Sequence, residues 1–380
     1  MTLALARRLE VRGTLVCRSA LSIGTWDESP FADIAVARDG TGRFVVPGTS
    51  LAGALRSWYG QHGRYGPHGR HPSEEDVRNL FGYVAEGSQQ ALVSLIRIDD
   101  APVEGSPAAD GSVDGGSPAV TAQVRDGVRI DPRTGSAMAG FLFSREVLPA
   151  GTRFAFRLTA DVQPPTAPRA HVEVGAAVRD LVSALVHGAV DLGGRTSQGL
   201  GRVVLEDATI SDSDLGSRDG LLTWLRNGPV PVPFVPAPRR GTGRLDIEIS
   251  WRPRRAVLVR DAEPGTAVNA LPLTARDARG DIRLLIPGSS ITRAFRAHAE
   301  RIVLTLSERD APIDVRTREV LPAVAALFGT GPGTEGQELA AGYRGILRIE
   351  DCHSTGFVTS GEWESVRSPS ATGSPSAPGG

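Results

Sequence analysis

The stretch LEVRGTLVCR, residues 9–18, has apolar and polar side chains that alternate as in a half-buried β-strand, and the other elements are predicted around it. The next patterned segment, PGTSLAGALRSWYG at residues 47–60, places apolar side chains at the spacing of an amphipathic helix. The other periodic segments are expected to be strands over 91–98, 152–161 and 202–210 and a helix over 176–189. The order βαββαβ predicts a ferredoxin-like α+β domain over residues 1–210.

A second set of the same motifs follows further along the chain. PGSSITRAFR at residues 287–296 repeats PGTSLAGALR at 47–56. Three shorter pairs keep the same order: Ala-Arg-Asp at 37–39 and 275–277, Leu-Phe-Gly at 80–82 and 327–329, and Arg-Ile-Asp-Asp at 97–100 with Arg-Ile-Glu-Asp at 348–351. The spacing within a pair grows from 238 to 251 residues along the chain, so we interpret the pattern as a tandem duplication with small insertions.

The second copy is predicted to be incomplete. It is expected to begin with a strand at 244–252 and to run to residue 351, followed by a low-complexity tail or loop at 352–380. Counterparts of the third strand, second helix and fourth strand are missing, so a longer chain or a separate chain is expected to complete this domain. The Pro-rich segment 211–243 is expected to be a stiff, extended linker.

The composition excludes several classes of protein. All 42 basic residues are arginine, which excludes Schiff-base enzymes, Lys-dependent P-loops and Ser–Lys catalysis. The net charge of −1 excludes a histone-like protein, and two cysteines are too few for a disulfide framework or a Cys-rich zinc site. No apolar run reaches the ~20 residues of a membrane span and no leader pattern is present, which predicts a cytoplasmic protein without membrane contact.

A glycine-rich segment, DLGGRTSQGLGRV at residues 191–203, lies between the predicted second helix and fourth strand. Dinucleotide and P-loop fingerprints run from strand to helix, so neither describes it. Its exposed N–H groups and the polar side chains of residues 195–198 would suit a phosphate backbone. The alternative is a flexible connection whose glycines serve only the turn.

Other candidate groups have ordinary structural explanations. His62, His68 and His71 lie close together in the sequence and could bind a metal, although an exposed loop is the simpler interpretation. His187 ends an apolar helix, where a packed or capping histidine is common. The seven arginines between residues 239 and 260 form the strongest local positive charge, which suits RNA or a solvated face.

Four of these motifs together resemble the RAMP superfamily, specifically the backbone subunits of type III CRISPR effector complexes. They are GTSLAGALRS at 48–57, LFG at 80–82, FSREVLPAGTRF at 143–154 and LGGRTSQGLGRV at 192–203, and the resemblance covers 9–209 and, more weakly, 244–351. It implies tandem ferredoxin-like, or RRM-like, domains that bind CRISPR RNA, complementary target RNA and other effector subunits. In that family a hairpin separates guide from target, and an aspartate in the loop after the first strand cleaves the target RNA.

The resemblance places this cleaving aspartate at Asp33, six residues before Asp39, where it would act with Mg²⁺ or another divalent cation. The chain would then be a metal-dependent endoribonuclease. The equivalent position in the second copy is Leu271, so that copy is not expected to cleave. The resemblance places the hairpin at DGVRIDPRTG, residues 126–135. The implied RNA-binding residues lie at the two helix starts, in this hairpin and in the glycine-rich loop: Ser50, Arg56, Arg129, Arg133, Gly193, Gly194, Arg195, Thr196, Ser197, Gln198, Gly199, Gly201, Arg202, Ser289, Ser290 and Arg293.

Three alternatives stay open. In the first, the same RNA-binding scaffold does not cleave, and Asp33 only braces a loop. In the second, the chain is a nuclease that processes precursor guide RNA, for which the histidines at positions 62, 68 and 71 are the only loop candidates for a general base. In the third, two ferredoxin-like modules form a protein–protein adaptor.

Overall fold

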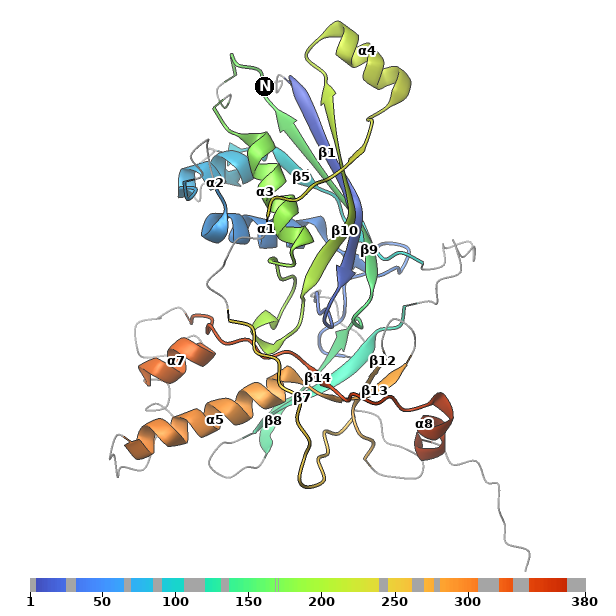
Figure 1. The fold of residues 1–380 in the computed structure, drawn as a ribbon, viewed down its shortest axis with the longest axis vertical. Coiled ribbons are helices and arrows are strands. Elements are labelled where there is room, and N and C mark those ends of the chain that lie inside the picture. The colour runs from blue at the N-terminus through green and yellow to red at the C-terminus, as the bar shows by residue number, and fades with distance from the viewer. Residues whose placement is uncertain are drawn as a thin grey trace, which may run out of the picture.

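The computed structural model is centred on β1, Arg7–Cys17, which confirms the strand predicted at 9–18. The structure describes residues 5–24, 32–64, 70–84, 91–105, 120–130, 137–167, 169, 171–238, 245–261, 270–276, 281–306, 321–330 and 342–367. β1 lies between β9, Arg153–Val162, and β10, Val203–Asp214, and runs antiparallel to both (Figure 1). Its alternating side chains therefore occupy the middle of a sheet.

Two further strands complete this sheet. β5, Ile96–Ile98, pairs with β9, and β11, Val232–Pro233, pairs with β10, so the order is β11-β10-β1-β9-β5. Without β11 the order is fourth, first, third and second strand, which is the antiparallel arrangement of a βαββαβ ferredoxin-like domain. The α+β class and the element order predicted for the first half of the chain are confirmed.

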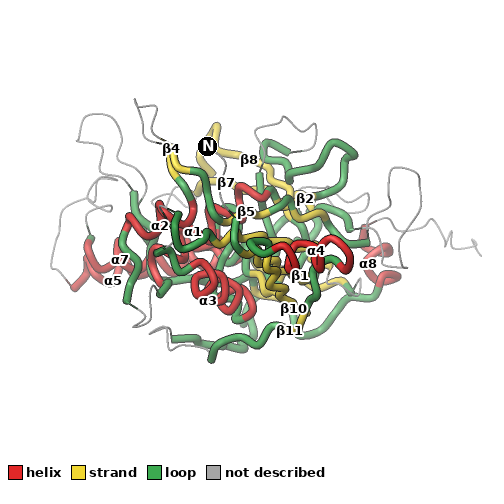
Figure 2. The backbone as a smooth tube through the Cα atoms, turned by 90° about the horizontal axis from the view of Figure 1, so that it is seen from above, coloured by secondary structure: helices red, strands yellow, loops and turns green. Residues whose placement is uncertain are grey.

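Two helices lie on one face of the sheet: α1, Gly48–His62, and α3, Val174–Val186 (Figures 1 and 2). α2, Glu74–Phe81, packs beside α1 and begins with a capping box between Ser73 and Asp76. The apolar stripes of the helices and the inner face of the sheet share one core, whose fully buried members include Leu15, Leu51, Leu55, Phe154, Leu158, Leu181 and Leu185. The predicted helix boundaries are correct to within a few residues.

The predicted strand at 91–98 is divided in the structure. Only β5 joins the main sheet, while β4, Ala91–Leu92, pairs with β3, Tyr83–Val84, in a short separate hairpin. Ser94 lies between them, and its hydroxyl donates to the carbonyl of Ile96 at 2.6 Å and accepts the Ile96 N–H at 3.1 Å. A side chain that bonds to nearby backbone competes with the ladder, so the chain turns at Ser94.

A long hairpin extends from the lower end of the main sheet in Figure 1. Its strands are β7, Gln123–Ile130, and β8, Ala137–Val147, in an antiparallel pair. The hairpin predicted around 126–135 is therefore confirmed, and its tip at 131–136 lies outside the described residues. Near its base, β2, Val45–Val46, pairs with β6, Ala101–Pro102, close to the start of α1.

The segment predicted as an extended linker is instead folded onto the sheet. β10 continues to Asp214, and α4, Arg218–Asn227, begins where the Ser217 side chain accepts the N–H of Gly220. β11 then returns along β10, and the Ala237 N–H donates to the Ser183 hydroxyl on α3. The proline-rich composition suggested stiffness, but the Ser217 cap and the free edge of β10 determine the path of this segment.

The strand predicted at 244–252 is not formed by the residues that the structure describes there. Leu245 and Ile247 are 80% and 72% exposed, although their alternation suits a buried strand. The matching residues of β1, in RLEV at 8–11 against RLDI at 244–247, are buried between β9 and β10. A strand needs neighbours for its hydrogen bonds, and the described C-terminal residues supply none here.

The rest of the C-terminal region forms a small three-stranded sheet with helices. β13, Ile282–Ile286, pairs with β12, Thr274–Arg276, and with β14, Cys352–His353. α5, Gly288–Leu306, confirms and extends the helix predicted at 287–296, and α7, Pro322–Phe328, packs beside it.

The tail predicted from residue 352 onward is ordered in its first part. β14 lies in this part, and α8, Ser360–Arg367, places Trp363 against Leu271 and Ile282. Residues 368–380 lie outside the described part of the chain.

Two hydrogen bonds within the N-terminal region have matching counterparts within the C-terminal region. The N–H of Gly48 at the start of α1 donates to Asp100 Oδ1 at 2.7 Å, and the N–H of Gly288 at the start of α5 donates to Asp351 Oδ1 at 2.9 Å. Likewise, Arg56 donates to the Gly82 carbonyl and Arg296 to the Gly329 carbonyl, both at 3.1 Å. The repeated sequence motifs therefore have the same local hydrogen bonds.

Candidate nucleic-acid interface

Asp33 lies in the loop between β1 and α1 and is held by the base of the hairpin. Its Oδ2 accepts the backbone N–H of Ser144 at 2.7 Å and the Ser144 hydroxyl at 3.2 Å, while its own N–H donates to Ser144 Oγ at 3.0 Å. The next residue, Ile34, forms a parallel bridge with Arg145 of β8. Asp33 itself is exposed, so its carboxylate is both fixed in place and accessible to a ligand.

Asp39, six residues after Asp33, has a different role. Its carboxylate accepts the hydroxyl and N–H of Thr41 and the N–H and guanidinium of Arg43. The Thr41 hydroxyl is the main reason that the pKa of Asp39 is lowered to about 2. This residue shapes the turn before α1.

Three arginines meet beside the hairpin base, and we call Arg145, Arg195 and Arg293 the arginine cluster. The guanidinium groups of Arg145 and Arg195 lie 5.9 and 4.9 Å from the centre of the Phe143 ring. The Arg145 side chain is on β8, Arg195 is in the glycine-rich loop, and Arg293 is in the second turn of α5. The fold thus brings three distant segments of the chain to one place.

The electrostatics of the arginine cluster favour an anion. Arg145 is only 9% exposed, and burial together with the positive charge of Arg195 lowers its pKa. Burial and Arg293 likewise lower the pKa of Arg195. Among the described residues no carboxylate forms an ion pair with Arg145 or Arg195, so the positive charges of these two side chains face one another. A phosphate group would relieve this repulsion through charge-assisted hydrogen bonds.

The glycine-rich loop is shaped by close packing as well as by its polar side chains. Gly193 and Gly201 have positive φ, and a Cβ there would lie 2.2 Å from the Ser22 carbonyl oxygen and 1.9 Å from that of Leu192. The expected exposed N–H groups are largely used: Gly194 donates to the Ser22 carbonyl and Gly201 to that of Ala20. These glycines therefore have a packing role, and contact of the loop with phosphate stays a prediction.

The polar centre of this loop is a short 3₁₀ turn, η1, Thr196–Gln198. Arg195 precedes it in a left-handed conformation, with φ 57°, and donates to Gln198 Oε1 at 3.0 Å. Gly194 lies directly beside the hairpin, since a Cβ there would be 3.7 Å from Arg145 Nη1. The loop therefore presents the Arg195 side chain, rather than backbone N–H groups, toward the hairpin base.

The other predicted RNA-binding residues lie at several places. Arg202 pairs with Glu350 at 3.0 Å, and Arg293 donates to the Val128 carbonyl of β7. The first turns of the two helices carry Ser50 on α1 and Ser289 and Ser290 on α5. Arg133 and the side chain of Arg129 lie outside the described residues.

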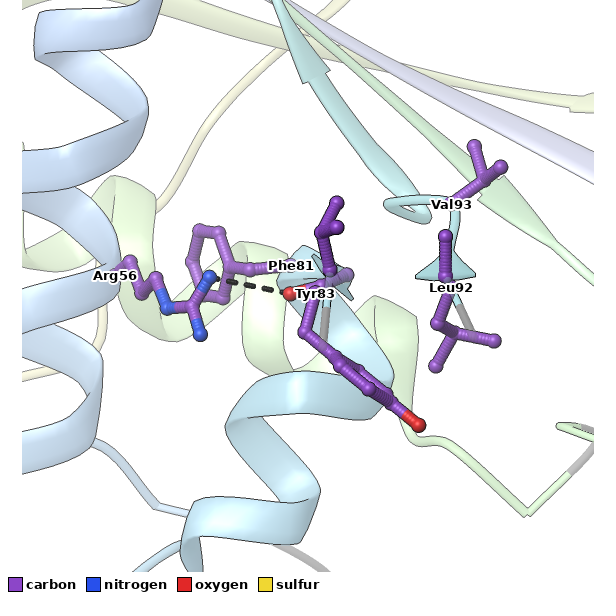
Figure 3. Close-up of a pocket in the computed structure, with 8 residues that line it drawn as sticks. Arg56, Phe81, Tyr83, Leu92 and Val93 are labelled. Carbon is purple, nitrogen blue, oxygen red and sulfur yellow. Dashed lines mark hydrogen bonds between the residues drawn. The ribbon is translucent and has the colours of Figure 1, made fainter. Parts of the chain in front are cut away.

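Arg56 borders a shallow pocket of about 440 Å³ between α1, α2 and the β3–β4 hairpin (Figure 3). Phe81, Tyr83, Leu92 and Val93 line the same pocket, and the Arg56 guanidinium points to the carbonyl of Gly82. Arg56 thus binds the carbonyl of the glycine that follows α2, just as Arg296 binds the carbonyl of the glycine that follows α7. The structure therefore gives Arg56 a local role in the fold.

The histidines do not form a metal centre in the described structure. His62 stacks on Trp58 and His71 contacts the carbonyls of Gln61 and Pro72, while His68 lies outside the described residues. No group of three or more histidine, cysteine, aspartate or glutamate side chains in the described ranges could hold a metal ion. His187 caps α3 and contacts the Ala237 carbonyl at 2.7 Å, which confirms a packing role.

The arginine-rich segment 239–260 is exposed where the structure describes its arginines. Arg252, Arg254, Arg255 and Arg260 are exposed, while residues 239, 240 and 244 are not described. No helix in the described part of the chain has the length and apolar character needed to cross a membrane.

Sequence reasoning missed Arg145 and Phe143 as site residues. Their spacing in FSREV could have identified them, because residues two apart on a strand lie on the same face and can contact the same ligand.

Comparison with known proteins supports this location for the site. Residues 13–204, half of the chain, match the profile of the RAMP superfamily. No curated protein matches the sequence. The matched segment runs from β1 to the start of β10 and contains Asp33, the hairpin and the glycine-rich loop. RAMP proteins are CRISPR-associated and bind CRISPR RNA and other effector subunits. The chain therefore belongs to the RAMP superfamily, with the RNA-binding role that this family has in CRISPR systems.

Proposed function

We propose that the chain is a backbone subunit of a type III CRISPR effector complex, which binds CRISPR RNA and cleaves the paired target RNA through Asp33. One observation carries this proposal: Ser144, which fixes Asp33, lies between Phe143 and Arg145 on β8. Ser144, which holds the carboxylate of Asp33, and Arg145, which belongs to the proposed phosphate-binding cluster, are thus adjacent residues of one strand.

Two tandem RAMP copies are part of the proposal. The matching hydrogen bonds at Gly48 and Gly288 support it, because each joins the start of a helix to the aspartate that ends the motif Arg-Ile-(Asp/Glu)-Asp. The first copy has the complete sheet, and the second contributes Arg293 to the arginine cluster. RNA would therefore pass along the junction of the two copies.

Binding of RNA at this junction follows from charge and shape. Arg145 and Arg195 would hold phosphate oxygens, and the ring of Phe143 gives a flat surface close by. Contacts to phosphate carry no sequence information, which suits a protein that must accept any guide. The base sequence of the target would be read by pairing with the guide RNA.

The cleavage reaction needs little from the protein because RNA carries its own nucleophile. The 2′ oxygen forms a bond to phosphorus as the bond from phosphorus to the 5′ oxygen breaks, and the proton of the 2′ hydroxyl ends on the leaving oxygen. Asp33 would accept that proton or orient the 2′ hydroxyl. The contacts with Ser144 engage Oδ2, and Asp33 Oδ1 would face the RNA.

A divalent cation fits this site only as a partner of the RNA. Asp33 supplies one carboxylate, and Mg²⁺ is commonly held by one or two carboxylates together with substrate phosphates. The cation would supply charge stabilisation at the phosphate being cleaved. Asp33 would hold it through Oδ1 while Ser144 keeps the carboxylate in place.

The contact between Asp33 and Ser144 also favours a second candidate function. In it Asp33 only fastens the loop to β8, and the chain is a non-cleaving scaffold. The assembled complex with guide and matched target RNA distinguishes the two. Asp33→Asn is expected to slow cleavage by ~10²–10⁴-fold at equal RNA occupancy, while Asp39→Asn leaves the rate unchanged. Wild-type cleavage by Asp33→Asn would show that the chain is a scaffold.

A further inference from the structure

Glu146 is a buried carboxylate with no part in the reaction proposed above. It lies on β8, and its side chain is only 8% exposed. Removing a carboxylate from water costs free energy unless the protein supplies a hydrogen-bond donor or a positive charge. Glu146 has one of each: Oε2 accepts the backbone N–H of Val36 at 3.0 Å, and Oε1 lies 3.8 Å from Arg38 Nη2. Both partners belong to the loop that carries Asp33.

Residues 33–36 of this loop, which we call the strap, lie alongside β8 in a parallel arrangement. The N–H of Ile34 donates to the Ser144 carbonyl at 3.3 Å, and the N–H of Glu146 donates to the Ile34 carbonyl at 2.9 Å. The two ends of the strap are held by side chains of β8 instead, with Ser144 at the first end and Glu146 at the last. The strap is therefore fastened to β8 along its whole length.

The side chains that hold the strap lie apart from the arginine cluster. Successive side chains of a strand point to opposite faces, so Ser144 and Glu146 share one face of β8 while Phe143 and Arg145 share the other. Glu146 is also buried, so it is not placed to touch RNA that the arginine cluster holds. An effect of Glu146 on the reaction must therefore pass through the strap.

We infer that Glu146 is a positioning residue for the proposed cleavage, because it holds the Val36 end of the strap and so sets where the Asp33 carboxylate lies. This inference rests on the proposed function. The contacts of Asp33 and Ile34 fix one half of the strap, and the bond to Val36 fixes the other half. Val36 is buried, so without this acceptor its N–H must move to find another one. Catalytic groups need to be held within about 0.5 Å of the productive geometry, so such a shift slows cleavage.

Two substitutions separate the reach of the Glu146 side chain from its charge. Glu146→Gln keeps the length of the side chain and an oxygen that accepts the Val36 N–H, but it removes the charge. Glu146→Asp keeps the charge, but it is one methylene shorter and its oxygens withdraw from Val36. In the assembled complex with guide and matched target RNA, Glu146→Asp should slow single-turnover cleavage by about tenfold and Glu146→Gln by less than about twofold. RNA affinity should be the same in both.

Glu10 provides the matched control. Its side chain is 10% exposed, and it pairs with Arg157 of β9 at 3.0 Å, so its contacts lie within the main sheet and not in the strap. Glu10→Asp and Glu10→Gln make the same chemical changes to a carboxylate that is buried to the same degree. Both should cleave at the wild-type rate, even where they lower the free energy of unfolding.

Two further measurements test the route from Glu146 to Asp33. Hydrogen exchange of the Val36 N–H should become faster in Glu146→Asp and stay slow in Glu146→Gln and in the Glu10 variants. In a double-mutant cycle, Glu146→Asp should have little further effect on the residual cleavage by Asp33→Asn, because the group that it positions is already inactive.

Wild-type cleavage by Glu146→Asp, or equal slowing by Glu146→Asp and Glu146→Gln, would overturn the inference while slow cleavage by Asp33→Asn upholds the proposed function. Wild-type cleavage by Asp33→Asn would instead contradict the proposed function itself. If circular dichroism shows that Glu146→Asp is unfolded, Glu146→Gln decides: a wild-type rate with slow exchange at Val36 supports the inference, and slow cleavage overturns it.

Discussion

Asp33 and Ser144 are joined in both directions: the backbone N–H of Asp33 donates to Ser144 Oγ at 3.0 Å, and the N–H of Ser144 donates to Asp33 Oδ2 at 2.7 Å. The loop that carries the carboxylate is therefore anchored to β8, although Asp33 and Ser144 lie 111 residues apart in the sequence. A change in the hairpin would be transmitted directly to Asp33.

The first prediction tests this positioning role. Ser144→Ala removes the hydroxyl but leaves the backbone N–H, so cleavage should slow by about tenfold while RNA affinity stays the same. Ser144→Thr keeps the hydroxyl and should restore the rate. Ser57→Ala, on the exposed side of α1, is the control. A loss of RNA affinity in Ser144→Ala would contradict a role confined to Asp33.

The second prediction concerns the salt dependence of RNA binding. If Arg145 and Arg195 each contact a phosphate, replacing either with glutamine should lower the slope of log affinity against log salt by about one. Arg202→Gln should leave the slope unchanged because Arg202 is paired with Glu350. Filter binding at several salt concentrations measures all three. If only Arg202→Gln lowers the slope, the RNA path lies on the Arg202 side of the loop.

The third prediction compares two glycines with the same backbone conformation. Gly42 and Gly201 have φ of 83° and 81°, but only at Gly201 would a Cβ collide with a carbonyl oxygen, that of Leu192. Gly42→Ala should lower the free energy of unfolding by about 1 kcal/mol, and Gly201→Ala by more than about 2 kcal/mol. Urea denaturation measures both. Equal losses would mean that the loop can move away from Leu192.

The fourth prediction uses the two cysteines as probes of burial. Cys17 faces the core and burial raises the pKa of its thiol to about 12, whereas Cys352 is half-buried. At pH 8 iodoacetamide should therefore label Cys352 and leave Cys17 unmodified until the chain is unfolded. Burial of the neutral thiol also implies that stability falls as pH rises above the ordinary thiol pKa toward 12, since only the unfolded state then releases the proton. Rapid native labelling of Cys17 would contradict the central position of β1.

The fifth prediction tests the ordered part of the C-terminal segment. Trp363 packs on Leu271 and Ile282, so Trp363→Ala should increase hydrogen exchange in β12 and β13. Exchange in β1 and β9 should stay slow because their core contains no residue of this region. Unchanged exchange in β13 would show that α8 does not stabilise the small sheet.

The first half of the fold was predictable because each of its elements has one dominant period. The alternation at 9–18 and the apolar stripe at 176–189 both describe residues that are buried in the structure. The same reasoning failed at 244–252, where the alternation is present but the described residues form no neighbouring strands. The periodicity of a segment shows that it is able to form a strand, and the presence of pairing partners determines whether the strand forms.

The candidate site was only partly predictable from the sequence. Asp33 and Arg195 were identified through the resemblance, but Arg145 was not, because its importance depends on Phe143 and Arg195 lying beside it. The linker was also misjudged, since the cap at Ser217 is a single side chain within a proline-rich segment. Contacts between distant segments determine the arginine cluster, whereas a local cap and the pairing of β11 with β10 determine the path of the linker.

The ion pair between Arg125 and Asp351 joins residues 226 positions apart, which has a consequence for synthesis of the chain. A ribosome completes the main sheet once β11 has emerged, well before Asp351 is made. During that interval we expect the nascent chain to carry a folded first domain whose Arg125, Gly199 and Arg202 are open to other molecules. The last part of translation would then cover these residues.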